Sequence, residues 1–104
     1  MRVISRRPLR DFSEEHADAK TPLDTWFSIM KGKTYANPHE VREDFPSASF
    51  IGDGRTVFDI GGNKYRLVVY MRYDLARIYV REVLTHEAYE RKTREGSLRE
   101  KYAP

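Results

Sequence analysis

The sequence predicts an α+β domain, in which N-terminal helices pack on one face of a small, mainly antiparallel β-sheet and leave the other face open. Two observations lead to this fold class. In the first half of the chain, apolar side chains recur at the three- and four-residue spacing of helices. In the second half they alternate with polar residues, as in strands, and glycine-containing segments interrupt the alternation where hairpin turns are needed.

The chain has 104 residues, which suits a single domain over residues 1–104 that can bury a core without covalent cross-links. It has no cysteine, which excludes a disulfide framework and a thiolate metal site and fits a reducing cytoplasm. The longest purely apolar run, Leu67 to Met71, is too short to cross a bilayer, and the basic N-terminus lacks the apolar segment of a secretory signal. We therefore expect a cytoplasmic protein without a membrane partner.

The positive charge is concentrated in the second half of the chain. Residues 1–52 hold eight Lys or Arg and eight Asp or Glu, whereas residues 53–104 hold eleven and eight, so the net charge of +3 comes from the second half. A charge of this size fits a simple solubility bias. It also fits a surface that attracts a polyanion, and charge alone does not choose between the two.

The first half is predicted to be a strand followed by helices. Residues 1–5 indicate an edge strand, and a helix is expected from Pro8 to about residue 18. Thr21 is the expected N-cap of a second helix, with an apolar stripe that includes Trp26 and Phe27, and Gly32 is its expected end. A third, short helical segment is expected from Asn37-Pro38 to near residue 46.

The second half is predicted to be strands. Residues 52–54 indicate a turn, residues 56–60 and 64–72 alternate around a Gly62-Asn63 hairpin turn, and a loop at 73–76 leads to a last strand at 77–83. The charged tail from Glu87 onward is expected to be helical and to fray toward Pro104.

These turns fix which side chains share a face of the sheet. The Gly62-Asn63 turn places Asp59 opposite Arg66, and the four-residue loop places Tyr70 opposite Tyr79 and Val68 opposite Arg81. One face is then almost entirely apolar and suits the N-terminal helices; it carries Phe58, Ile60, Tyr65, Leu67, Val69, Met71, Ile78 and Val80. The opposite, open face collects Val57, Asp59, Arg66, Val68, Tyr70, Tyr79 and Arg81.

The polar face has the groups that RNA cleavage requires. Two neighbouring guanidiniums repel each other unless an anion lies between them, and a phosphodiester is such an anion. RNA supplies its own nucleophile, the 2′-hydroxyl, so a protein needs only a proton carrier and positive charge on the phosphorane. Arg66 and Arg81 suit the charge, His86 the proton, and Tyr89 base stacking or proton transfer.

Each of these residues also has a purely structural explanation. Arg66 can pair with Asp59 as an ordinary surface contact, His86 can be a first-turn helix residue after a Thr85 cap, and Tyr89 can pack the last helix on the sheet. Tyr70 and Tyr79 can be a simple aromatic pair. The two other histidines are distant in sequence from this group, so we expect His16 and His39 to be helix-surface residues and predict no metal site.

The stretch from Phe58 to Leu67, the segment Ile78-Tyr79-Val80-Arg81 and the motif Thr85-His86-x-x-Tyr89 together resemble the HigB-type toxins of the RelE/ParE-like superfamily. The order strand, GGN, strand, strand, THxxY is the specific part, and the first half of the chain follows the family in outline. Where the family often has Ala-Glu before the tyrosine and aspartate after it, this chain has Glu87-Ala88 and Glu90, which keep the acidic character.

This resemblance implies a type II toxin that cleaves messenger RNA during translation, usually on the ribosome. It implies a cognate helix-turn-helix antitoxin, contact with DNA only through that antitoxin, and no cofactor. The implied catalytic residues are Arg66, Arg81, His86 and Tyr89, and the candidate RNA-binding residues are Lys64, Tyr70, Tyr79, Arg91 and Lys92. Two other functions stay open: a non-catalytic toxin that poisons a protein such as DNA gyrase, and a plain RNA-binding module.

Because Arg66 and His86 are expected on or just beyond the open face, their replacement by alanine is expected to cost about 1 kcal/mol or less of stability.

Overall fold

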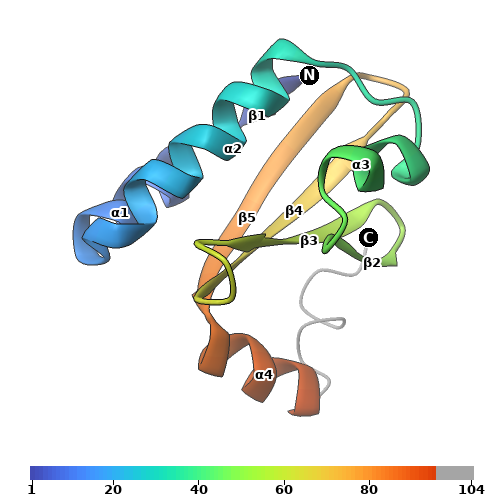
Figure 1. Cartoon of the computed structure of the whole chain (residues 1–104). Coiled ribbons are helices and arrows are strands. Elements are labelled where there is room, and N and C mark those ends of the chain that lie inside the picture. The colour runs from blue at the N-terminus through green and yellow to red at the C-terminus, as the bar shows by residue number, and fades with distance from the viewer. Residues whose placement is uncertain (96–104) are drawn as a thin grey trace.

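The computed structural model describes residues 1–95 and has the predicted α+β architecture (Figure 1). The elements in chain order are β1 (Arg2–Ile4), α1 (Arg7–Glu15), the 3₁₀ turn η1 (Ala17–Ala19), α2 (Lys20–Gly32), α3 (Pro38–Asp44), β2 (Ser49–Gly52), β3 (Arg55–Ile60), β4 (Tyr65–Arg72), β5 (Arg77–Thr85) and α4 (His86–Glu95). The sheet order is β1-β5-β4-β3-β2, and β1 is parallel to β5 while the other neighbours are antiparallel. The part of the predicted helical tail beyond residue 95 lies outside the described residues.

The N-terminal segments confirm the predicted order, with one correction. β1 is an edge strand, as expected. The first helix ends at Glu15, and η1 then leads directly into α2, whose N-cap is Ala19 and not Thr21. Thr21 therefore lies inside the first turn, where its carbonyl accepts a hydrogen bond from Thr25 Oγ1 at 3.0 Å. Because η1 leads directly into α2, the helix starts before Thr21, and the first backbone N–H groups that a capping side chain would satisfy lie earlier in the chain.

The third helix begins at the predicted residue. Asn37 is its N-cap, and its Oδ1 accepts a hydrogen bond from the Glu40 backbone N–H at 3.0 Å. After α3 the chain forms β2, which the sequence interpretation missed although Phe50 and Ile51 favour a strand. The turn after β2 requires glycine at Gly54, because its φ is +83° and a Cβ atom there would lie 2.6 Å from the Met71 carbonyl oxygen.

The predicted hairpin registers hold until a bulge in β5. Asp59 pairs with Arg66 and Tyr70 with Tyr79, as expected. Val69 pairs with Val80, but Val68 pairs with Glu82, so the predicted pairing of Val68 with Arg81 is wrong. Arg81 is the extra residue of a bulge, which shifts the register of the following pairs by one residue and lets both Arg81 and Glu82 project to the same face.

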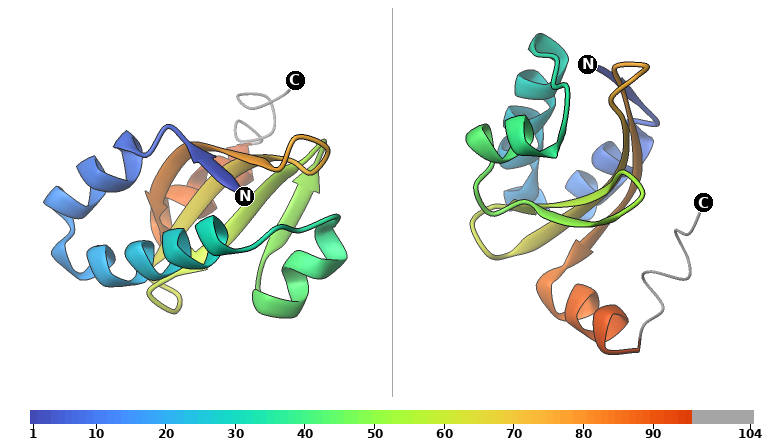
Figure 2. Two further views of the ribbon diagram at one scale, coloured as in Figure 1. Left: turned by 90° about the horizontal axis from the view of Figure 1, so that it is seen from above. Right: turned by 90° about the vertical axis from the view of Figure 1, so that its right-hand side faces the viewer.

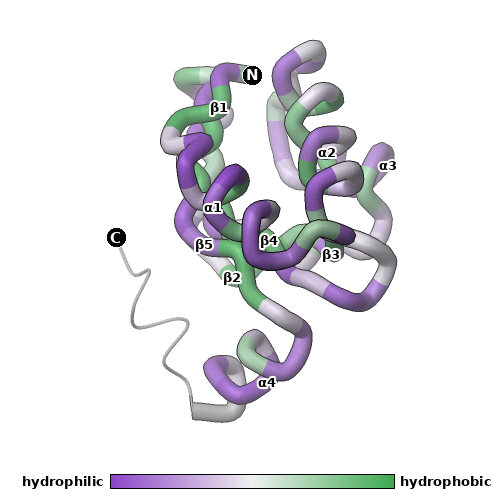
Figure 3. Tube along the Cα trace, turned by 90° about the vertical axis from the view of Figure 1, so that its left-hand side faces the viewer, coloured by the Kyte–Doolittle hydropathy of each residue, from purple (hydrophilic) through white to green (hydrophobic). Residues whose placement is uncertain are grey.

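The helices α1, α2 and α3 cover one face of the sheet (Figure 2). The apolar residues predicted for that face are all in one buried core, where the Trp26 and Phe58 rings meet edge to face at 5.6 Å. Hydrophobic positions are concentrated in these layers, whereas α4 is mostly hydrophilic (Figure 3). No helix among residues 1–95 is both long and apolar enough to span a membrane.

The second face is only partly open, which corrects the prediction. β5 continues to Thr85, two residues further than expected, and α4 begins at the next residue. Ala88 and Tyr89 of α4 then pack against a small second cluster formed by Val57, Val68 and Leu84. The uncovered remainder of this face carries the half-buried Tyr70 and Tyr79 and the exposed Arg81.

Candidate active site

The junction between β5 and α4 brings His86 to the sheet. The backbone N–H of His86 donates to the Lys64 carbonyl at 3.0 Å, which joins the start of α4 to the β3–β4 turn. Thr85 caps the helix, because its Oγ1 accepts from the Ala88 N–H at 3.2 Å. The Thr85-His86-x-x-Tyr89 motif therefore forms the start of α4, and it places His86 beside Arg66 at the N-terminal end of β4.

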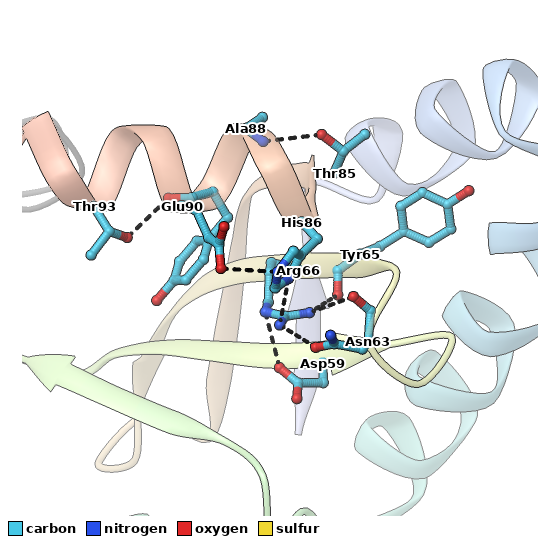
Figure 4. A network of polar contacts seen from close by, with 10 residues as sticks. Asp59, Asn63, Tyr65, Arg66, Thr85, His86, Ala88, Glu90 and Thr93 are labelled. Atoms are coloured by element: carbon cyan, nitrogen blue, oxygen red, sulfur yellow. Dashed lines mark hydrogen bonds and ion pairs between the residues drawn. The ribbon is translucent and has the colours of Figure 1, made fainter.

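Arg66 is the centre of a polar network and is only 8% exposed (Figure 4). Its Nη1 donates to the carbonyls of Tyr65 at 3.1 Å and Asn63 at 3.3 Å, and its Nη2 donates to Asn63 Oδ1 at 2.6 Å. Nη2 also lies 2.9 Å from His86 Nδ1, and Nε lies 3.2 Å from Asp59 Oδ1. These contacts engage all three nitrogens of the guanidinium.

The contact with Arg66 defines how His86 is oriented. Because arginine can only donate, His86 Nδ1 must accept, and we assign the neutral ring with its proton on Nε2. Nε2 lies 3.0 Å from Glu90 Oε1, one helical turn along α4. The side chains of His86 and Glu90 are 31% and 57% exposed. A continuous chain thus runs from Asp59 through Arg66 and His86 to Glu90, with its outer end in solvent (Figure 4).

Tyr89 joins the network through its ring. The ring centroid lies 5.8 Å from the Arg66 Cζ atom, within the range of a cation–π contact, and the side chain packs on the second cluster. The packing explanation given above for Tyr89 is thus confirmed, and so is the cross-strand pairing of Arg66 with Asp59. Stacking of Tyr89 on RNA remains a prediction.

Arg81 lies on the same face as Arg66 and contacts different residues. Its Cζ atom lies 5.8 Å from the centroid of the Tyr70 ring, and that ring lies 6.1 Å from the Tyr79 ring. Arg66 contacts His86 at 2.9 Å. The expectation that Arg66 and Arg81 together hold one phosphate stays a prediction.

The remaining RNA-binding candidates are dispersed around this face. Lys64 forms an ion pair with Asp18 at 3.0 Å, away from Arg81, and Lys92 forms one with Glu82 at 2.8 Å. Arg91 is exposed on α4. The two lysines are thus paired with carboxylates; Lys64, Arg81 and Arg91 are exposed, whereas Lys92 is half-buried.

Three residues that the sequence interpretation did not select belong to the site: His16, Asn63 and Glu90. His39 is a helix-surface residue as predicted, since its side chain is 87% exposed and it faces Glu43 at 3.8 Å. His16, in contrast, is half-buried at the C-cap of α1 and lines a cavity of about 460 Å³ together with His86, a neighbour that the sequence did not predict. No signal in the sequence connects positions 16 and 86; only the packing of the end of α1 beside the β3–β4 turn does so. Among residues 1–95, no three His, Asp or Glu side chains form a group that could hold a metal ion.

Comparison with known proteins identifies the family. The family model for HigB toxins, described as the RelE-like toxic component of a toxin–antitoxin system, matches residues 19–92. The chain belongs to the HigB toxin family. The matched range contains Arg66, Arg81, His86, Tyr89 and Glu90, so the whole polar network lies within it.

Several HigB proteins are similar to this chain. The mRNA interferase toxin HigB of Escherichia coli (strain K12) is 29% identical over 92 residues, which cover 86% of this chain and 88% of the relative. The mRNA interferase HigB of Shigella flexneri has the same identity and coverage. The mRNA interferase HigB of Escherichia coli O6:H1 is 25% identical over 96 residues, which cover 90% of this chain and 93% of that protein. As a HigB-family toxin, this chain has a cognate antitoxin as its partner.

Proposed function

We propose that this toxin is an mRNA interferase, an endoribonuclease that cuts messenger RNA by attack of the RNA's own 2′-hydroxyl on the neighbouring phosphate. The names of the similar HigB proteins support the reaction class. The observation that carries the proposal is the Arg66–His86–Glu90 chain, which presents an oriented imidazole–carboxylate pair at the protein surface. Such a pair can accept and return a proton near neutral pH.

In the proposed reaction, the 2′ oxygen forms a bond to phosphorus and the bond between phosphorus and the 5′ oxygen breaks. The proton leaves the 2′-hydroxyl for the Glu90 carboxylate, the member of the His86–Glu90 pair that can accept it, and the pair returns a proton to the departing 5′ oxygen. The products are a 2′,3′-cyclic phosphate and a 5′-hydroxyl end. The protein residues supply orientation, proton transfer and positive charge.

The geometry favours different roles for the two arginines. All three guanidinium nitrogens of Arg66 contact acceptors of the protein, so we assign to it the positioning of His86, which differs from the phosphate contact predicted from the sequence. Arg81 is exposed on the same face and is the better candidate for stabilising the charge of the phosphorane. Tyr70 and Tyr79 would support the RNA beside it by stacking.

We further propose that cleavage takes place on translating ribosomes in the cytoplasm and that the cognate antitoxin is a helix-turn-helix protein. These points rest on the family resemblance. They agree with the basic second half of the chain, which suits a surface rich in RNA phosphate.

The test is expression of the toxin in cells without an antitoxin, with mapping of the 5′ ends of one abundant transcript. Wild type should arrest growth and produce new 5′ ends, and His86→Ala and Glu90→Gln should lose both effects by roughly 100-fold. His39→Ala is the matched control, because His39 also faces a glutamate one helical turn away but is remote from the network. Growth arrest by wild type with an intact transcript would refute the proposal and favour a toxin that binds a protein target.

A further inference from the structure

A cavity beside His86 has no role in the reaction described so far. Its volume is about 460 Å³, within the range of sites that hold small organic ligands. One wall is His16 at the end of α1, a second is Asn63, Lys64 and Tyr65 at the β3–β4 turn, and a third is the start of α4. His86 is part of that third wall, so anything bound in the cavity lies next to the proposed proton carrier.

The His16 ring stacks on a single aromatic ring and also lines the cavity. Phe12 stacks on one face, with ring centroids 4.2 Å apart and planes 19° apart. Tyr65 lies 5.1 Å from Phe12 and 5.5 Å from His16. These three distances form a nearly equilateral triangle, so Tyr65 sits beside the stack and does not cover its end. Among residues 1–95, the stacked partner of His16 is Phe12 alone.

The wall that holds His16 is fixed to the turn opposite it. Asp18, two residues after His16, accepts a hydrogen bond from the Tyr65 hydroxyl and pairs with Lys64 at 3.0 Å. These contacts join η1 to the β3–β4 turn, so the cavity is formed before any ligand binds. A preformed site avoids the entropic cost of ordering its walls.

Two polar groups at the cavity can contact the edge of a flat ring. Asn63 Oδ1 accepts from Arg66, which orients the amide so that its NH₂ group is left as a donor, without a partner among residues 1–95. Glu87 lines the cavity from the first turn of α4 and provides an acceptor. A nucleobase fits these groups, because it stacks and offers both an acceptor and an amine on its edge.

We propose that this cavity is a nucleobase subsite, in which His16 stacks on the base of a nucleotide that flanks the scissile phosphate while Asn63 and Glu87 contact the base edge. The subsite rests on the proposed mRNA cleavage and deepens it. Adenine, cytosine and guanine carry an exocyclic amine that can donate to Glu87, whereas uracil offers only its ring N3–H, which lies between two carbonyl oxygens that repel a carboxylate. The toxin should therefore cut less efficiently where uridine occupies this position.

The experiment is cleavage of one reporter mRNA in a translation reaction, with all 5′ ends mapped, for wild type and four variants. His16→Ala should lower the cleavage rate by about 10-fold, within the range measured for loss of a base–aromatic stack. His16→Phe should stay within about threefold of wild type, because a phenyl ring still stacks on a base. Glu87→Ala should admit uridine at one position flanking the cut, and His39→Ala should change neither rate nor site preference.

Thermal melting of each variant separates the subsite from a purely structural role of His16. If His16 only supports the fold, the rate of His16→Ala will follow its folded fraction and the base preference at the cut sites will stay the same; that result overturns the subsite. A His16→Ala protein that cuts like wild type overturns it as well, while mRNA cleavage itself stands. No cleavage by folded, growth-arresting wild type would instead refute the proposed function and the subsite with it.

Discussion

Replacement of Arg66 by alanine is predicted to destabilise the protein far more than a surface substitution. The guanidinium is 8% exposed and contacts acceptors on Asp59, Asn63, Tyr65 and His86. The variant leaves Asp59, whose side chain is 28% exposed, without its cation, and it leaves the Tyr65 carbonyl without this donor. The expectation of about 1 kcal/mol from the sequence, based on an exposed sheet face, is therefore corrected upward.

The magnitude follows from the cost of orphaned partners. Removing one member of a fully buried ion pair costs about 3–5 kcal/mol, and the partial exposure of Asp59 reduces that figure. We predict a loss of about 2–4 kcal/mol in the free energy of unfolding, which for a domain of this size corresponds to a fall in Tm of roughly 8–16 °C. Urea unfolding and thermal melting both measure it.

Arg72→Ala is the matched control. Arg72 is also a β4 arginine that pairs with an aspartate, Asp74 at 2.7 Å, but its side chain is 40% exposed, so its loss should cost about 1 kcal/mol or less. If Arg66→Ala melts within about 2 °C of Arg72→Ala, Arg66 is not the centre of a buried network. The positioning role that we assign to it would then be wrong.

Three further predictions follow from other parts of the structure. Arg81→Ala should keep the melting temperature within about 3 °C of wild type, because Arg81 is exposed at the bulge. The same variant should slow mRNA cleavage by roughly 100-fold, and unchanged cleavage would exclude Arg81 from the charge-stabilising role. Tyr35→Phe should cost about 1–2 kcal/mol in urea unfolding, because the Tyr35 hydroxyl, on a side chain only 1% exposed, donates to Asp44 at 2.6 Å; a neutral effect would show that this bond adds no stability. A hydrogen bond from Tyr65 lowers the pKa of Asp18, and one from Lys33 lowers that of Asp44. A carboxylate whose folded pKa lies below the unfolded value of about 3.8 stabilises the fold above that pH, and this stability is lost as the pH falls through the folded pKa. The Tm should therefore decline below about pH 4, and it should decline less steeply in Asp44→Asn. An equal decline in that variant would exclude Asp44 as a source of the pH dependence.

The sheet was predictable because its pattern is local. Alternation around Gly62-Asn63 is compatible with only one register, since a shift by one residue would expose Phe58 and Leu67 and bury Asp59. The bulge at Arg81 was not predictable, because an extra residue in a run of mixed apolar and charged side chains leaves no mark in the sequence. The bulge changes the partner of Val68 from Arg81 to Glu82 and shifts by one residue the part of β5 that leads to His86.

The site was predictable in its residues but not in its contacts. The motif around His86 and the strand position of Arg66 follow from the sequence, and both residues lie in one network. The burial of Arg66 was missed because α4 covers part of a face that a strand pattern alone leaves open. His16 was missed because its contact with the cavity depends on how α1 packs against the β3–β4 turn, which is a property of the tertiary structure.

The most direct test of the central claim is cleavage of an mRNA that carries a single 2′-deoxynucleotide on the 5′ side of a mapped cut. The cut at that position should disappear while cuts at unmodified positions remain. The ordinary product should end in a 2′,3′-cyclic phosphate or its 3′-phosphate hydrolysis product. Equal cleavage of the deoxy-substituted position would contradict the account, because the nucleophile would then be something other than the RNA's own hydroxyl.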